Sequence, residues 1–176
     1  SPAVLLRREI EGTDFAAMLP AHVTQAKFVR TVLTALSENP ALYTCDKRSV
    51  LSACMKAASD GLLPNGREAA MVVFKDKDRG PVATYMRMIA GVYKLLRNSG
   101  DLSGIQSHVV YENDQFDYQL GDDSHIIHRP AMGDRGRHIG VYAIAKLKDG
   151  FTDREFMSFQ DIERVRAVSK KKTDGP

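Results

Sequence analysis

The residues most able to do chemistry are basic side chains around a glycine in the stretch 87–98. If this stretch is helical, Lys94 lies about 20° short of Arg87 around the helix axis. Gly91 lies about 40° beyond Arg87, and Arg97 lies about 80° away from it. The cations would then surround a position without a side chain, where a phosphate backbone could approach closely. A solvated helix face gives the same pattern, so both interpretations stay open.

The stretch 139–147 carries a second group of residues that suits nucleic acid. In a strand, alternation places its small apolar residues on one face, which we expect to be the core face: Val141, Ala143, Ala145 and Leu147. Tyr142, Ile144 and Lys146 share the other face, together with Lys148 if the strand extends that far. An aromatic ring among lysines is suited to a nucleic-acid surface, although any half-exposed strand can carry this pattern.

A phosphate-loop motif is present in spacing but lacks the required residue types. Gly61 and Gly66 have the separation of a phosphate-binding loop. Arg67 stands where a phosphate-binding Lys is needed, and Glu68 stands where a hydroxyl for Mg²⁺ is needed. We therefore predict the end of a helix followed by a loop, without nucleotide binding.

Carboxylates, histidines and cysteines leave one metal-dependent alternative. A metal-dependent nuclease could use an aspartate group, for which a solvated loop is the preferred interpretation: Asp114, Asp117, Asp122 and Asp123. His125 and His128 are three apart, so on a strand they would point to opposite faces and share a metal poorly. Cys54 lies on an apolar helical stripe and is interpreted as a core thiol. The sequence therefore predicts no catalytic residue, no metal and no cofactor.

Composition indicates a folded, non-membrane chain. It has 176 residues, of which 43% are hydrophobic and 27% charged, enough for one domain with a buried core. No apolar run approaches the ~20 residues of a membrane span. Two cysteines indicate a reducing, intracellular setting. A start at Ser-Pro and an end at Gly-Pro suggest a fragment.

The net charge of +3 is unevenly distributed along the chain. Residues 67–97 carry seven Lys/Arg against three Asp/Glu, whereas residues 108–125 carry five acids and no Lys or Arg. Residues 126–148 are basic again, and the run 170–172 is interpreted as a solvated tail. Such blocks could form a basic and an acidic face that join subunits head to tail, or they could be scattered solvated charge.

The elements that must position these groups change in type along the chain. Helices are predicted first, one capped by Thr24 and one running from Asp46 to Gly61. Later elements are a hairpin over 70–74 and 81–86, the helix 87–98, a hairpin of 105–111 with 116–120, a pair of 139–147 with 154–157, and a helix over 159–168. This order predicts an α+β fold with N-terminal helices, a β-hairpin, a central helix, a small mostly antiparallel sheet and a closing helix.

Eight stretches along the chain form an ordered set: 19–24 (LPAHVT), 39–42 (NPAL), 52–74 around GLLP, 96–100 (LRNSG), 109–112 (VVYE), 128–130 (HRP), 141–150 (VYAIAKLKDG) and 163–169 (ERVRAVS). In this order and spacing they resemble the RecT family of single-strand annealing recombinases. The resemblance spans nearly the whole chain and implies one annealing core domain over residues 1–176. In the family the chain continues into a Trp-containing basic segment, which would lie beyond Pro176 and outside this sequence.

The resemblance implies a phage or mobile-element protein, acting in the cytoplasm of a bacterial host. It would bind single-stranded DNA and anneal complementary strands without ATP in homologous recombination, through an annealed duplex intermediate. It would not be an enzyme. It would form rings or helical filaments and work beside a partner exonuclease. A non-DNA protein-interaction module remains an alternative, as does the nuclease.

Family members often carry a basic residue before the glycine of the helix after the hairpin. Ala90 stands there in this chain, so Arg87 or Lys94 would have to compensate. The residues that we predict to contact DNA are Lys75, Lys77, Arg79, Arg87, Gly91, Lys94, Arg97, Arg129, Arg135, Arg137, Lys146 and Lys148.

Overall fold

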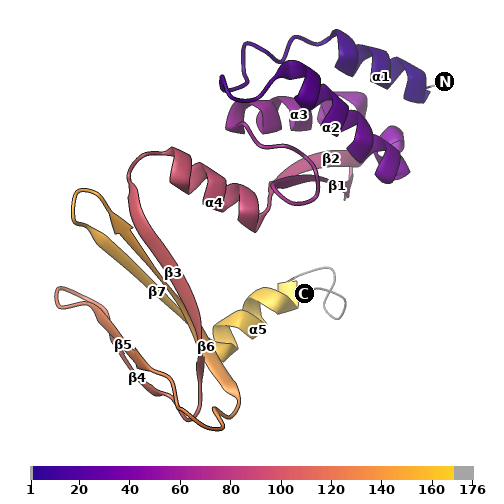
Figure 1. Cartoon of the computed structure of the whole chain (residues 1–176). Coiled ribbons are helices and arrows are strands. Elements are labelled where there is room, and N and C mark those ends of the chain that lie inside the picture. Colours follow the sequence, from indigo (N-terminus) through magenta and orange to yellow (C-terminus); the bar gives the residue numbers. More distant parts are fainter. Residues whose placement is uncertain (1, 169–176) are drawn as a thin grey trace. The chain divides into compact units, whose positions relative to one another are not determined.

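The computed structural model describes residues 2–168, and it divides into two units, one ending at Ser99 and one beginning at Gly100 (Figure 1). Each unit combines helix with antiparallel strands. The predicted α+β fold class is therefore confirmed, whereas a single domain over residues 1–176 stays a prediction. Within residues 2–168, no helix is long and apolar enough to cross a membrane. The basic run 170–172 lies outside the described residues.

Helix caps define the start of the N-terminal unit. Its first elements are α1 (Pro2–Gly12), α2 (Gln25–Glu38), the 3₁₀ helix η1 (Pro40–Thr44) and α3 (Lys47–Asp60). Thr24 caps α2 by accepting a hydrogen bond from the amide of Lys27, and Asp46 caps α3 through the amide of Ser49. Gly61 ends α3 in the left-handed conformation, with φ of 67°, which glycine adopts without strain. All three caps were predicted from the sequence.

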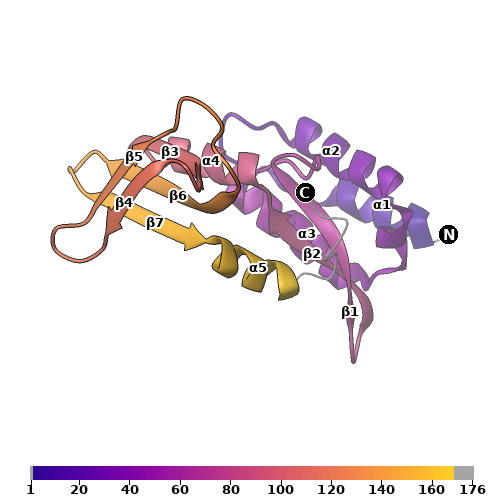
Figure 2. The same cartoon turned by 90° about the horizontal axis from the view of Figure 1, so that it is seen from below.

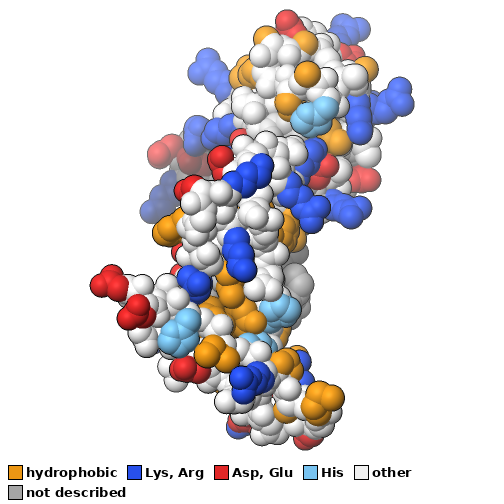
Figure 3. Space-filling view, turned by 60° about the vertical axis from the view of Figure 1, so that its left-hand side comes forward, with side chains coloured by type: hydrophobic (Ala, Val, Ile, Leu, Met, Phe, Trp, Pro, Cys, Tyr) orange, Lys and Arg blue, Asp and Glu red, His pale blue; other side chains and the backbone are white. Residues whose placement is uncertain are grey.

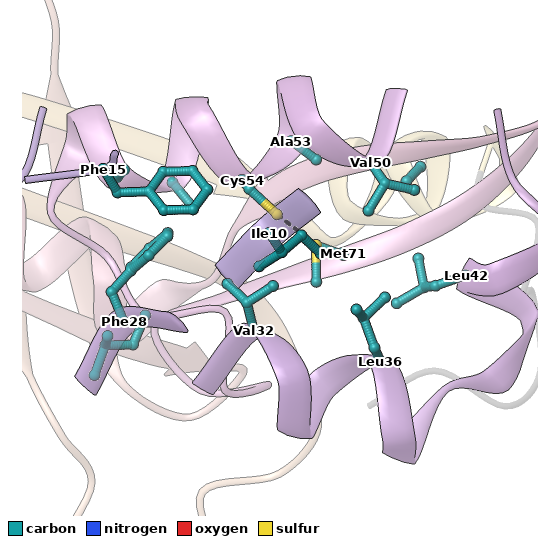
Figure 4. Close-up of a cluster of buried hydrophobic side chains, with 14 of the residues drawn as sticks. Ile10, Phe15, Phe28, Val32, Leu36, Leu42, Val50, Ala53, Cys54 and Met71 are labelled. Carbon is teal, nitrogen blue, oxygen red and sulfur yellow. Dashed lines mark hydrogen bonds between the residues drawn. The ribbon is translucent and has the colours of Figure 1, made fainter. Parts of the chain in front are cut away.

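The core of this unit lies where α1, α2 and α3 meet. Phe28, Val32 and Leu36 of α2 point toward α3, which contributes Val50 and Cys54, and all five are fully buried (Figure 4). Their spacing of three or four residues places them on one helix face. The Cys54 thiol lies among them, as the sequence predicted.

The hairpin β1 (Ala69–Asp76) and β2 (Gly80–Arg87) follows, and α4 (Ile89–Asn98) comes directly after it. The strands pair antiparallel from Ala69 opposite Arg87 to Asp76 opposite Gly80. The predicted hairpin is confirmed, and it is longer than predicted at both ends. Because pairing continues through Arg87, the helix begins two residues later than the sequence suggested. The hairpin is attached to α3 by a bond of 2.8 Å from the Ala83 amide to the Ser49 hydroxyl.

The C-terminal unit contains a three-stranded sheet, a separate hairpin and a closing helix (Figure 2). The sheet has the order β3 (Leu102–Tyr111), β6 (His138–Leu147), β7 (Thr152–Ser158), the hairpin is β4 (Gln115–Gln119) with β5 (His125–Arg129), and the helix is α5 (Phe159–Val168). The predicted pair of 139–147 with 154–157 and the final helix are confirmed.

The predicted hairpin of 105–111 with 116–120 is wrong. The turn between them exists, since the Asp114 amide donates to the Tyr111 carbonyl at 3.1 Å. After this turn, however, β4 pairs with β5, and β3 pairs with β6. The physical reason is the packing of Phe116, whose ring lies 5.9 Å from that of Tyr142 and 5.1 Å from that of Phe156. β4 therefore packs against a face of the sheet instead of extending its edge.

This packing also corrects the predicted faces of the strand 139–147. Tyr142, predicted to face solvent, is only 7% exposed because the β4–β5 hairpin packs against its ring. Val141 and Ala143, predicted to face the core, are half-buried. The Tyr142 ring, considered above for a nucleic-acid surface, is therefore part of the core of the unit.

Candidate nucleic-acid interface

A groove in the N-terminal unit runs between α3 and β2. Its larger hollow, of about 710 Å³, is lined by residues of α3 and the end of β2: Ser52, Met55, Lys56, Ser59, Asp60, Tyr85, Met86 and Arg87. A second hollow of about 330 Å³ shares Ser52, Lys56 and Tyr85 with the first and adds Arg48 and Arg79. The two hollows therefore form one continuous surface along α3, which we call the α3–β2 groove.

The lining of the α3–β2 groove is basic. It gathers the side chains of Arg48, Lys56, Arg79 and Arg87, and Asp60 is the only acid among the residues that line the two hollows. Serine hydroxyls and the exposed Met55 and Met86 also line the larger hollow. Cations accompanied by hydroxyl donors are the groups that contact phosphates in nucleic-acid complexes.

The one acid of the groove is paired. Asp60 accepts hydrogen bonds from Arg87, with Nε 2.6 Å from Oδ2 and Nη2 3.1 Å from Oδ1. The Tyr85 hydroxyl donates a third bond to Oδ2 at 2.7 Å. The Arg87 bonds, assisted by Tyr85, hold the pKa of the Asp60 carboxyl below its usual range. Arg87, which lines the same groove, thus compensates the negative charge of Asp60.

The turn of the β1–β2 hairpin presents another group of predicted residues. Lys75, Lys77 and Arg79 are exposed there. Asp76 closes the turn by accepting bonds from the amides of Asp78 and Arg79, and its carboxylate also lies 3.3 Å from Arg79 Nη2. Arg79 lines the α3–β2 groove, whereas neither lysine is found among the lining residues.

The predicted phosphate site around Gly91 is not formed. Arg87 lies on β2 and not on the helix, so it does not share a helical face with Lys94. Gly91 is buried, and a Cβ there would lie 2.0 Å from the Glu68 carbonyl oxygen. The glycine is therefore required for packing of α4 against the loop 61–68, which joins α3 to β1.

Lys94 serves the same attachment of α4. Its Nζ lies 2.9 Å from Glu68 Oε2 and 3.3 Å from the Gly61 carbonyl oxygen. The Leu63 amide also donates to Glu68, at 3.0 Å. Although burial acts to raise it, these bonds hold the pKa of Glu68 below its usual range. Arg97, exposed near the end of α4, has no ion pair within the described part of the chain.

In the C-terminal unit, Arg135 is part of a buried ion network. Its Nη2 lies 2.6 Å from Asp114 Oδ2, and its guanidinium lies 4.2 Å from the centre of the Tyr111 ring. The Asp114 side chain is fully buried and also lies 2.9 Å from His128 Nε2. The Arg135 bonds, with those of His128 and two backbone amides, hold the pKa of Asp114 far below its usual range.

The remaining predicted cations of this unit are exposed. Arg137 pairs with Glu112 at 2.7 Å, and Arg129 Nη1 lies 3.5 Å from Gln115 Oε1. Lys146 and Lys148 are exposed and have no ion pair among residues 2–168. Two ion pairs, Glu112 with Arg137 and Asp114 with Arg135, therefore connect the acidic block 108–125 to the basic block 126–148 inside the unit. Figure 3 shows acidic and basic side chains interspersed on one face of the N-terminal unit as well.

The aspartates considered for a nuclease do not gather. Asp114 is enclosed by its network, and Asp117 lies 3.3 Å from the ring of His125. Across the described residues, no three His, Cys, Asp or Glu side chains are placed to hold a metal ion. The two histidines have separate structural contacts, as predicted.

Sequence reasoning missed Arg48 and Lys56. Both lie on α3, where Ser52 stands between them at helical spacing and Val50 and Cys54 mark the opposite, buried face. The sequence could have indicated them, because the exposed face of a helix lies opposite its apolar stripe, and the apolar stripe of α3 was identified. The groove itself depends on how β2 packs against α3, which the sequence did not indicate.

Two comparisons with known proteins found similarity over most of the chain. The family model described as "RecT family" matches residues 26–176. The curated protein "Protein RecT" of Escherichia coli (strain K12) is 35% identical over 168 residues. The alignment covers 93% of this chain and 62% of that protein, so the chain spans less than two thirds of the relative's length. Both findings agree with the resemblance seen in the sequence.

Proposed function

The chain belongs to the RecT family, and we propose on that basis that it binds single-stranded DNA and anneals complementary strands without ATP. Family membership is the observation that carries the proposal. Strand annealing requires no acid–base step. It requires cations that neutralise two phosphate backbones while the bases stay accessible for pairing.

The α3–β2 groove supports this proposal as the DNA-contacting surface of the N-terminal unit. Arg48, Lys56, Arg79 and Arg87 line it, and its single acid is compensated by Arg87. The exposed Lys75 and Lys77 extend the basic character along the hairpin. Lys146, Lys148, Arg129 and Arg97 remain proposed contacts, while Arg135, Gly91 and Lys94 have structural partners that argue against a direct role.

The wider role proposed for the protein follows from the same membership. It includes strand annealing in recombination and repair, assembly into a ring or helical filament, a partner exonuclease that supplies the single strand, and action in the cytoplasm of a bacterial cell. An oligomer would supply the length of binding surface, because one domain contacts only a few nucleotides.

Two measurements test the proposal. A labelled oligonucleotide is titrated with the protein at low and high salt, and we expect binding that weakens as salt rises. Complementary oligonucleotides are then mixed with the protein, with and without ATP, and duplex formation is followed. Equal acceleration in both cases is expected, and a strict ATP requirement or no acceleration would contradict the proposal. Cleavage of the strands that depends on Mg²⁺ would favour the nuclease alternative.

A further inference from the structure

Asp60 is a surprising residue in a groove proposed to bind a polyanion. It is the last residue of α3, at the helix end where the dipole places partial negative charge. A carboxylate at this helix end is electrostatically unfavourable, and it would also repel a phosphate. The three hydrogen bonds that Asp60 accepts from Arg87 and Tyr85 offset this cost.

The geometry of the pair leaves the arginine available. Asp60 binds Nε and one N–H of Nη2, which are two of the five donors of a guanidinium. The side chain of Arg87 is 54% exposed, whereas that of Asp60 is 21% exposed. Both residues line the larger hollow. The carboxylate is thus the more sheltered partner, and the guanidinium is the more accessible one.

We propose that Asp60 is a positioning residue that holds the Arg87 guanidinium in a fixed orientation, from which its remaining N–H donors bind a phosphate of single-stranded DNA. This inference rests on the proposed function and deepens it. A long arginine side chain that is already ordered loses less conformational entropy when the phosphate binds. Asp60 therefore favours binding even though its own charge opposes it.

The opposite possibility is that Asp60 competes with DNA for Arg87. A phosphate that replaced Asp60 in both of its bonds with Arg87 would leave the Asp60 carboxylate at the negative end of α3. The Tyr85 hydroxyl would then be its one remaining donor among the three. Sharing Arg87 between the carboxylate and the phosphate avoids this loss, because the two acceptors use different donors of the same guanidinium. The structure therefore favours positioning over competition.

The two possibilities predict opposite signs for Asp60→Asn. The amide has the same shape but no charge, so it pairs poorly with Arg87. If Asp60 positions Arg87, the variant binds a labelled single-stranded oligonucleotide about 3- to 10-fold more weakly than the parent, although the groove has lost a negative charge. If Asp60 competes, the variant binds more tightly, which would overturn the inference.

Asp78→Asn is the matched control. Asp78 is exposed in the β1–β2 turn, and its carboxylate has no hydrogen bond or ion pair among the described residues. Its replacement removes the same charge from the same unit, so binding should stay equal or become slightly tighter. Weakening by both variants alike would mean that loss of an acid, and not loss of orientation, is responsible, and would overturn the inference.

A double-variant cycle with Arg87→Ala separates positioning from a general effect on folding. If Asp60 acts through Arg87, Asp60→Asn causes no further loss of affinity once Arg87 is absent. An equal loss in both backgrounds would overturn the inference. Tyr85→Phe, which keeps the Asp60–Arg87 pair but removes one bond to the carboxylate, should weaken binding less than Asp60→Asn does. Circular dichroism establishes that each variant is folded. No binding by the parent would overturn the proposed function, whereas failure of the sign test alone overturns only the role of Asp60.

Discussion

Gly91 lies so close to Glu68 that no side chain fits between them. A Cβ on Gly91 would be 2.0 Å from the Glu68 carbonyl oxygen and 2.8 Å from Cδ1 of Leu62. Three residues further along α4, Lys94 binds the carboxylate of the same Glu68. The helix is thus fastened to the preceding loop by its backbone and by an ion pair at one place. The glycine allows packing within the protein and not the approach of a ligand.

Gly91→Ala should therefore destabilise the N-terminal unit. The added methyl group meets backbone, which cannot turn aside as a flexible side chain can, so we expect a loss of about 3 kcal/mol in the free energy of unfolding. Urea denaturation measures it. Gly12→Ala is the control, because nothing lies within 4 Å of a Cβ at the end of α1. Stability of Gly91→Ala equal to that of the parent would show that α4 can move away from the loop.

Features that depend only on residues close together in the sequence could be predicted from it. The caps Thr24, Asp46 and Gly61 and the apolar stripes of α2 and α3 are local patterns, and each was found in its expected place. The start of α4 does not follow from such a local pattern. Whether Arg87 ends a strand or begins a helix is decided by its pairing with Ala69, eighteen positions earlier in the chain.

The candidate site was harder to predict for the same reason. A count of charges in a block does not show which of them find partners. Asp114 and Arg135 are separated by 21 positions, yet they form an ion pair in which the carboxylate is fully buried. Lys56 and Arg48, which have no ion pair within residues 2–168, lie on a helix whose exposed face forms a groove only because β2 packs beside it.

Asp114→Asn should lower the stability of the C-terminal unit in a pH-dependent way. The pKa of Asp114 is lower in the folded than in the unfolded protein, mainly through its bonds from Arg135. The stabilisation is therefore fully present above the unfolded value of about 3.9, and it is lost as the pH falls toward the lower folded value. The midpoint temperature of Asp114→Asn should lie at least ~5 °C below that of the parent at pH 7.

The difference between Asp114→Asn and the parent should shrink below about pH 4, because there the Asp114 carboxylate becomes protonated in the unfolded parent while it stays ionised in the folded parent. Thermal unfolding at pH 7, 5 and 3, followed by near-ultraviolet circular dichroism, measures it. Asp122→Asn serves as the control, since Asp122 is exposed in the β4–β5 loop. A difference that stays constant over this range would mean that the network stabilises by shape and not by charge.

Cys54 should resist alkylation in the folded protein. It is fully buried among the helices of the N-terminal unit, and burial raises the pKa of its thiol to about 12. Since the thiolate is the reactive form, both access and ionisation are suppressed. Mass spectrometry after treatment with iodoacetamide should find label on the half-buried Cys45 and none on Cys54 until denaturant is added. Early labelling of Cys54 would show that this core opens locally.

Arg48 and Lys56 should contribute to DNA binding without contributing to folding. Both are exposed on α3 and line the α3–β2 groove. Replacing either by Ala should weaken binding of a single-stranded oligonucleotide of any sequence. The slope of log affinity against log salt should fall by about 0.7 for each phosphate that the variant no longer neutralises. The midpoint temperature should change little, because neither side chain has an ion pair within residues 2–168.

Arg30→Ala and Arg135→Ala serve as controls for Arg48 and Lys56. Arg30 is an exposed cation of α2 that does not line the groove, so its loss should leave the salt slope unchanged. Arg135 pairs with the buried Asp114 carboxylate, so its loss should lower the midpoint temperature of thermal unfolding, unlike the loss of Arg48 or Lys56. Fluorescence anisotropy at four salt concentrations gives the slopes. If Arg30→Ala lowers the slope as much as Lys56→Ala does, DNA responds to the overall charge of the unit and the groove is not its path.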